Sequence, residues 1–259
     1  MPRGVSIYAE GTSVLHRAHP LTKGCFTLVA IVLAFIAPSL PWVVAIALVI
    51  IGMLLAAGVF TRFVPVAIGV LLPITILLLL VQGFANPANR TVFISVGPIA
   101  FYREGLAIAV ATAARIFCLI GATFLLTFTT RPPDLAEALM QRGLSPRFGY
   151  VVQAALQMIP QSLESADRIR DAQRARGLET EGPLIRRARA YLPLLLPLVL
   201  SSLVATQERA MALEVRGFGL KVRRYPRVDL HDTSFQRVLR WLLIALVPLA
   251  IAARFAGWQ

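Results

Sequence analysis

The sequence contains little of what a soluble enzyme or a disulfide-stabilised domain needs. Its 259 residues include two cysteines, three histidines, 13 acidic residues and only two lysines, Lys23 and Lys221. Cys25 and Cys118 both lie in apolar stretches, so neither a disulfide framework nor the spacing of a metal site is present. Charged residues make up 15% of the chain, against roughly a quarter in soluble domains. With 57% hydrophobic residues, the composition favours a membrane protein.

Signatures of catalysis are missing as well. Neither lysine completes a P-loop, because threonine precedes Lys23 and leucine precedes Lys221 where glycine is required. The chain has no His-Glu-x-x-His metal helix and no Gly-x-Ser-x-Gly elbow. It also lacks the Asp-x-x-Asp-Gly spacing of a membrane phosphoalcohol transferase. We therefore expect a protein without catalytic residues or cofactors, to which any energy is supplied by partner subunits.

His16 and His19 are the one pair of residues near the N-terminus that could ligate a metal. They lie three residues apart, in a polar and basic segment that ends at Lys23. No cluster of acids or cysteines accompanies them, so we interpret the pair as part of an interfacial turn before Pro20. The sequence predicts no metal site.

Two runs without a charged residue occupy the first third of the chain. The first run holds 38 residues, 24–61, and the second holds 27, 63–89. A bilayer-spanning helix takes about 20 mostly apolar residues, so the first run has room for two spans and the second for one. Two later apolar stretches bring the total to about five. In chain order the expected spans are Gly24–Ala37, Trp42–Phe60, Phe63–Phe84, Gly105–Phe128 and Trp241–Ala253.

Most of the positive charge lies between the fourth and fifth expected spans. Residues 131–240 hold 18 of the 26 basic residues and 11 of the 13 acidic ones, in a chain whose net charge is +13. Lysine and arginine accumulate on the cytoplasmic side of membrane proteins, so we expect this segment and the basic N-terminus in the cytoplasm. Binding to nucleic acid is the competing interpretation. The basic residues alternate with acids and aromatics are sparse, so we expect no nucleic-acid partner.

Two long segments of the basic region have the periodicity of amphipathic helices. In residues 146–176, apolar residues recur every three or four positions and polar residues occupy the other face. Residues 183–216 begin with arginines, continue through 17 uncharged residues at 191–207 and end amphipathically. Because 17 residues is a marginal transmembrane length and prolines interrupt it, we expect a helix along the membrane surface. A further span is the alternative.

The sequence thus predicts an all-α, polytopic membrane protein in three parts. Residues 1–130 form a membrane domain of four transmembrane helices, with short β-like pieces in the loop 85–104. Residues 131–240 form a cytoplasmic domain, which holds a short helix at 134–142 and the two long amphipathic helices. Residues 241–259 form the C-terminal transmembrane helix.

The two long segments end in the same short pattern. The first closes with Ala175-Arg176-Gly177 and the second with Val215-Arg216-Gly217, and a large apolar residue follows each. Two similar helix ends predict two similar docking elements. Ordinary glycine caps on two surface-lying helices are the alternative interpretation.

Arg115 lies near the middle of the fourth expected span. A charge at that depth is costly and normally faces the interior of the bundle, where it has a partner. Two interpretations follow: Arg115 donates hydrogen bonds to neighbouring backbone or to a polar residue, or it contacts a partner subunit.

These features resemble the transmembrane T component of energy-coupling factor (ECF) transporters, the vitamin and metal importers of the ABC superfamily. Residues 15–23 are similar to the family's His-x-x-x-Pro-x-x-Lys lead into the first span, and residues 129–139 to its Thr-rich link into the coupling region. The two Arg-Gly helix ends resemble the family's Ala-Arg-Gly motifs. Val215 departs from that pattern, because the family often has alanine there.

The resemblance implies a non-catalytic coupling subunit in the inner membrane of a bacterium. Arg176 and Arg216 would bond to acids on two ABC ATPase subunits, and Gly177 and Gly217 would end the two helices. The apolar faces of these helices would hold a membrane-embedded S component, which binds a vitamin or a metal ion such as cobalt. The transported substrate stays open. The alternatives are an integral membrane enzyme and a membrane scaffold with surface-lying helices.

Overall fold

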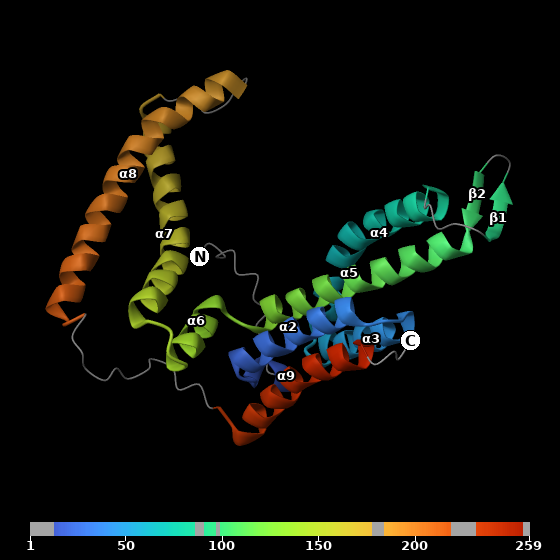
Figure 1. The fold of residues 1–259 in the computed structure, drawn as a ribbon. Helices are drawn as coiled ribbons and strands as arrows, with labels where there is room; N and C mark the ends of the chain where they lie inside the picture. Colours follow the sequence, from blue (N-terminus) through green and yellow to red (C-terminus); the bar gives the residue numbers. More distant parts are fainter. Residues whose placement is uncertain (1–12, 86–90, 97–98, 178–183, 219–231, 256–259) are drawn as a thin grey trace. The chain divides into compact units, whose positions relative to one another are not determined.

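Helices dominate the computed structural model of the chain (Figure 1). The structure describes residues 13–85, 91–96, 99–177, 184–218 and 232–255. The helices are α1 (Val14–Arg17), α2 (Pro20–Ile36), α3 (Leu40–Ala56), α4 (Phe60–Ala85), α5 (Arg103–Thr129), α6 (Pro132–Gln141), α7 (Pro146–Ala175), α8 (Leu184–Val215) and α9 (Ser234–Phe255). One antiparallel hairpin, β1 (Val92–Val96) and β2 (Ile99–Tyr102), lies between α4 and α5. The predicted all-α class is confirmed, with this hairpin at the expected β-like pieces.

Five helices have the composition of membrane spans. Among the described residues, the apolar part of α4, α5 and α9 are long and apolar enough to cross a bilayer, while α2 and α3 are apolar helices of 17 residues each. Seventeen residues is near the lower limit for a span.

Four predicted boundaries were wrong by three or more residues. Helix α2 begins at Pro20 and not at Gly24, and α3 ends at Ala56 and not at Phe60. Helix α4 begins at Phe60 and not at Phe63, and α9 begins at Ser234 and not at Trp241. The starts of α2, α4 and α9 lie earlier than expected because charged or polar residues are included in their first turns.

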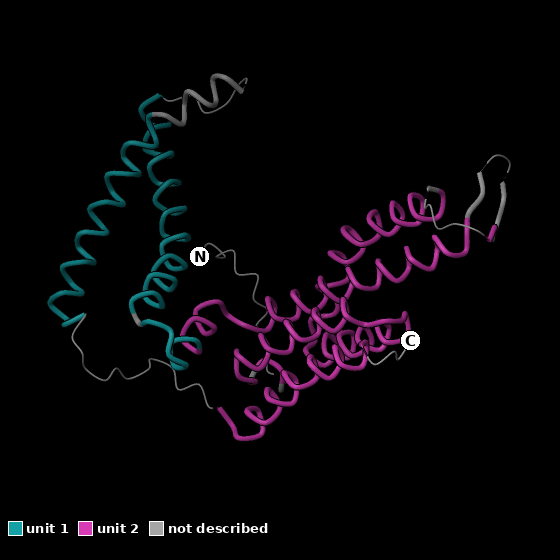
Figure 2. The backbone as a smooth tube through the Cα atoms, viewed as in Figure 1, with its two compact units in different colours: residues 1–5, 139–229 teal, residues 6–138, 230–259 magenta. Residues whose placement is uncertain are grey.

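The contacts divide the chain into two compact units (Figure 2). One unit contains residues 6–138 and 230–259, and therefore all five apolar helices; the other contains residues 139–229 together with residues 1–5. The second unit includes α7 and α8.

Helix α9 runs parallel to α2 within the first unit. The backbone N–H of His19 donates to Oε1 of Gln236 at 3.1 Å, and at the other end Nη1 of Arg254 donates to the carbonyl of Ile36 at 3.3 Å. The starts of the two helices are therefore side by side, as are their ends. If both helices cross a bilayer, they cross it in the same direction.

Helix α5 runs antiparallel to α2. Nζ of Lys23 in the first turn of α2 donates to the carbonyl of Thr129 at the end of α5, while Nε of Arg115 donates to the carbonyl of Ala34 near the end of α2. The start of α2, the end of α5 and the start of α9 therefore lie at one end of this unit. Both connections to residues 139–229 leave from that end.

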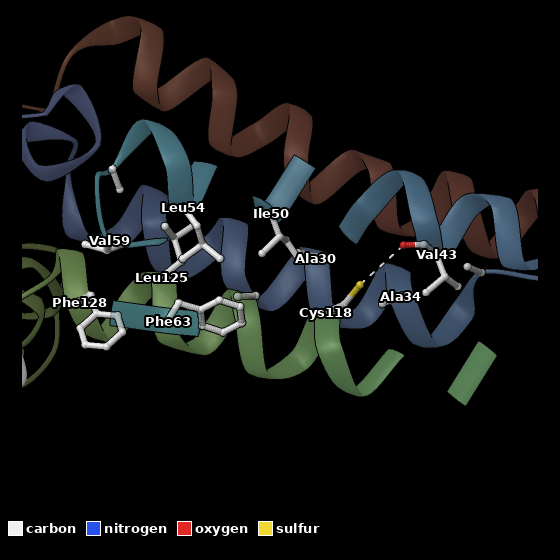
Figure 3. Close-up of a cluster of buried hydrophobic side chains, with 13 residues drawn as sticks. Ala30, Ala34, Val43, Ile50, Leu54, Val59, Phe63, Cys118, Leu125 and Phe128 are labelled. Carbon is white, nitrogen blue, oxygen red and sulfur yellow. Dashed lines mark hydrogen bonds between the residues drawn. The ribbon is translucent and has the colours of Figure 1, made fainter. Parts of the chain in front are cut away.

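The core of the first unit lies where α2, α3 and the start of α4 pack against α5 (Figure 3). Val43, Ile50, Leu54 and Phe63 are fully or almost fully buried, and small residues of α2 let the helices approach. Gly121 of α5 lies at a close contact, because a Cβ added there would lie 2.9 Å from Cγ2 of Ile50. Small residues at helix contacts are typical of packing in membranes.

The outer faces of the same helices are apolar as well. Leu72 and Leu77 of α4 are more than half exposed, as are Leu48 of α3 and Leu242 of α9. Soluble monomers rarely expose continuous apolar surfaces of this extent, whereas lipid chains cover such a surface without cost. The described helices therefore have the character of a polytopic membrane protein.

Candidate docking site

Helices α7 and α8 form an antiparallel pair within the second unit (Figure 1). Near the start of α7, the ring of Tyr150 packs on the ring of Phe218, which follows the end of α8, with 4.9 Å between centroids. In the middle of the pair, the guanidinium of Arg209 donates to Oε1 of Gln161. The end of α8 therefore lies at the start of α7.

The end of α8 is a Schellman motif built on Gly217. Gly217 has a φ of 70°, in the left-handed region that favours glycine. Its N–H donates to the carbonyl of Glu214 at 2.9 Å, and the N–H of Phe218 donates to the carbonyl of Leu213 at 2.8 Å. These two hydrogen bonds define the motif. They place Arg216 at the C-cap position, the last residue before the chain turns away.

The end of α7 shares the left-handed glycine and one of these two hydrogen bonds. Arg176 is its C-cap residue, and Gly177 has a φ of 88° and donates its N–H to the carbonyl of Arg174 at 3.0 Å. The two arginines thus occupy equivalent positions on two helices. The repeated Arg-Gly pattern in the sequence corresponds to a repeated helix end in the structure.

The two Arg-Gly helix ends lie far apart in the structure. Because α7 and α8 are antiparallel, Gly217 lies near the start of α7 and Gly177 lies at its end. The 30 residues of α7 cover roughly 45 Å at about 1.5 Å per residue, so the two arginines lie on the order of 40 Å apart. The two arginines therefore lie at two separate places and do not share one composite site.

Both arginine side chains are available to a partner. Ala175, Arg176, Val215 and Arg216 are all exposed, and no hydrogen bond or ion pair to another described residue holds either guanidinium. Arg170 on α7, in contrast to these two arginines, forms an ion pair with Asp167 at 3.0 Å. Two exposed, unpaired guanidiniums at helix ends suit acidic groups on a partner surface.

We expect Gly217→Val to weaken docking at the end of α8 about tenfold. A β-branched residue in the left-handed region is strained by roughly 1–2 kcal/mol, so the Schellman hydrogen bonds break and Arg216 loses its fixed position. Amide exchange at the end of α8 and partner binding by the purified protein measure the two effects. Gly69→Val is the matched control, because Gly69 lies in α4 with nothing within 4 Å of an added Cβ. Unchanged binding by Gly217→Val would show that the cap does not position Arg216.

Arg115 binds the end of a neighbouring helix. Its Nε donates to the carbonyl of Ala34 and its Nη2 to the carbonyl of Ala37, both at 3.3 Å. Each of these carbonyls stands four residues before a proline, Pro38 or Pro41, which has no N–H to offer. Ala34 and Ala37 are buried, so the guanidinium supplies donors that the backbone lacks. Of the two interpretations of this residue, hydrogen bonding to neighbouring backbone describes its contacts.

We expect Arg115→Leu to lower the stability of the protein in detergent by about 2–4 kcal/mol. An unsatisfied buried carbonyl costs about 1–3 kcal/mol, and this substitution leaves two of them, while removal of the partly buried charge offsets part of the loss. Thermal unfolding measures the change, with Arg62→Leu as a control because Arg62 is exposed. We also expect lower activity of an intact complex. Full stability and full activity together would mean that Arg115 has no role.

A largely buried ion pair that was not expected from the sequence lies at the start of α9. Arg240 is only 7% exposed, and its Nη2 lies 2.5 Å from Oδ2 of Asp232. Its Nη1 donates to the hydroxyl of Thr22 on α2 at 3.3 Å. A spacing of eight residues is not a helical pairing distance, so the pattern of charges gave no signal for this pair.

The sequence of the chain is similar to those of known proteins along most of its length. The family of CbiQ, a cobalt transport protein, matches residues 11–226. The chain belongs to the CbiQ family. Its relatives include the energy-coupling factor transporter transmembrane protein EcfT of Brevibacillus brevis, which is 31% identical over 97% of this chain and 96% of its own. EcfT of Acidaminococcus fermentans is 33% identical over 97% of this chain and 95% of its own.

These matches confirm the resemblance to the T component of ECF transporters. A third relative, EcfT of Clostridium kluyveri, is 32% identical over 95% of both chains. The CbiQ-family match covers both Arg-Gly helix ends and the segments at residues 15–23 and 129–139. The chain is thus a membrane protein and a transmembrane component of a transporter.

Proposed function

We propose that this chain is the coupling subunit of an ECF-type importer. Two ABC ATPase subunits bind at Arg176 and Arg216, an S component binds the substrate in the membrane, and the chain transmits motion between them. The chain itself catalyses nothing. The observation that carries the proposal is the pair of similar helix ends, each with an exposed arginine whose guanidinium has no partner among the described residues.

The chemistry of the two arginines favours acidic partners. A guanidinium presents its N–H groups as a planar fork, which matches the two oxygens of a carboxylate. The glycines next to both arginines have no side chain, so a partner's backbone can approach closely. Since the two ends lie on the order of 40 Å apart by the length of α7, two ATPase subunits fit this arrangement better than one.

The apolar faces of α7 and α8 favour a second kind of partner. Ile159 and Leu163 of α7 are each 58% exposed, and Leu203, Val204 and Met211 of α8 are exposed to a similar degree. Large exposed apolar surfaces mark protein or membrane contacts. An S component is itself apolar, and it is the occupant that we assign to these faces.

The direction of insertion follows from the distribution of charge. The end of α5 and the starts of α2 and α9 lie at one end of the first unit, and the segments near them are rich in arginine. By the positive-inside rule, this end faces the cytoplasm, together with the N-terminus. The two docking arginines are then on the side where ATP is available.

Purification of the tagged chain from its native membrane, followed by mass spectrometry, tests the proposal. We expect two ATPase chains per copy, together with one small integral membrane protein, and no ATP hydrolysis by the chain alone. Absence of any ATPase at stoichiometric level would overturn the proposal. Turnover of a lipid or nucleotide by the isolated chain would favour the alternative of an integral membrane enzyme.

A further inference from the structure

Two segments of the chain that the docking site does not use meet at one corner of the first unit. They are residues 15–23 and residues 129–139. Nζ of Lys23 donates to the carbonyl of Thr129 at 2.7 Å and to the carbonyl of His16 at 3.1 Å. One side chain therefore joins α1, α2 and the end of α5, across 106 residues of sequence.

The acceptor at Thr129 suits an ammonium group. Thr129 is the last residue of α5, and Thr130 is extended, with φ of −130° and ψ of 127°. The last carbonyls of a helix have no partner within it and carry partial negative charge. Thr129 and Thr130 are 2% and 6% exposed, so water is a poor substitute for Lys23. Asp134, in the first turn of α6, attracts the ammonium further.

The other side of this contact is itself held firmly. His19 caps α2 by accepting the N–H of Leu21 on Nδ1 at 3.2 Å, and its own N–H donates to Gln236 of α9. The buried pair of Arg240 and Asp232 also reaches α2. Lys23 thus joins the corner between α5 and α6 to two helices, α2 and α9, that hydrogen bonds hold together.

We propose that Lys23 is a positioning residue for coupling, which clamps the corner between α5 and α6 to α2. The last turn of α6 begins the segment 139–229, which contains both docking arginines, so one of the two connections by which a displacement of that segment reaches the membrane unit passes through this corner. With the hydrogen bonds of Lys23 intact, the displacement moves α2 and α9. Without them, the chain bends between α5 and α6, and the displacement does not reach α2 and α9. This inference rests on the coupling function proposed above.

The test compares Lys23→Met with Thr27→Val in the complex that co-purifies with its ATPases. Thr27 is the matched control, because its hydroxyl is buried on α2 and also donates to a carbonyl of α5, that of Ala122, at 3.3 Å. Hydrogen exchange is measured in peptides that cover α6 and the first turns of α2 and α9, with and without ATP and vanadate. A purely structural role changes exchange equally in both conditions, whereas a positioning role changes the difference between them.

In the unaltered complex we expect ATP and vanadate to change exchange at α6 and at the starts of α2 and α9. In Lys23→Met the change at α6 persists, and the change at α2 and α9 falls roughly tenfold, the scale of one lost hydrogen bond to a charged group. Thr27→Val retains both changes, and ATP hydrolysis stays within about twofold in both variants.

Three results would overturn the inference. The first is an unaltered ATP-dependent change at α2 in Lys23→Met, and the second is an equal loss in Thr27→Val. If Lys23→Met yields no folded complex, Lys23→Gln, which keeps a donor without the charge, is measured instead; a full ATP-dependent change at α2 in that variant is the third. Failure of the proposed function looks different, because no ATPase then co-purifies with the unaltered chain.

Discussion

Replacing Arg176 and Arg216 together by glutamate is expected to release both ATPase subunits while the chain stays in the membrane. Both guanidiniums are exposed at helix ends, so the substitutions disturb no internal contact of the described residues. Hydrogen bonds to charged groups contribute about 1.5–3 kcal/mol each, and reversal of the charge adds repulsion from the partner's acids. We expect affinity at each end to fall by roughly a hundredfold or more.

The matched control for this variant is Arg168→Glu. Arg168 is exposed on the same helix as Arg176 but lies away from its end, with a hydrogen bond to the hydroxyl of Ser165 at 3.1 Å. Co-purification from membranes, quantified per copy of the chain, gives the stoichiometry for each protein. The single variants are expected to retain one ATPase each. Stoichiometric ATPase in the double variant would remove the basis of the proposed docking.

Arg240→Leu is expected to destabilise the protein by about 3–5 kcal/mol. The substitution leaves Asp232 as a largely buried carboxylate without its 2.5 Å partner, and breaking a buried pair from one side costs several times more than losing an exposed one. The hydroxyl of Thr22 also loses its donor. Thermal or denaturant unfolding in detergent, read from the helical signal, measures the effect.

Arg237→Leu is the control for that measurement. Arg237 lies on the same helix and its Nε is 3.9 Å from the same carboxylate, but its side chain is 60% exposed. Exposed ion pairs contribute about 0–1 kcal/mol, so this variant should remain close to the unaltered protein. Adding Asp232→Asn to Arg240→Leu should recover part of the lost stability, because the largely buried negative charge is then gone. Equal effects of Arg237→Leu and Arg240→Leu would show that burial does not strengthen the pair.

The helices could be predicted from the sequence where several local signals agree. Helix α7 was expected at residues 146–176 and spans Pro146–Ala175, because proline at its start, helical periodicity along it and glycine after it agree. The start of α9 could not be predicted in this way. Its first turns contain Arg237 and Arg240, and tertiary contacts of those residues with Asp232 and α2 stabilise a segment that hydropathy assigns to a loop.

The same distinction applies to the functional residues. The repeated Arg-Gly pair is a local signal, and its glycines do adopt the left-handed conformation that a helix end requires. The separation of the two ends depends on the antiparallel direction of α7 and α8, which no local pattern encodes. Lys23 and Thr129 are 106 residues apart, and so are joined only by the packing of α2 on α5. The hydrogen bonds that Arg115 donates to the carbonyls of Ala34 and Ala37, in place of the N–H groups that prolines lack, likewise follow from the fold.

The antiparallel arrangement of two helices with equivalent ends has a consequence for symmetry. Two antiparallel helices can be exchanged by a two-fold axis that passes between them, perpendicular to their length. Such an exchange puts Arg176 in the place of Arg216 and Gly177 in the place of Gly217. A single asymmetric chain can in this way offer matching surfaces to a two-fold dimer, whose two halves would otherwise require two copies of their partner.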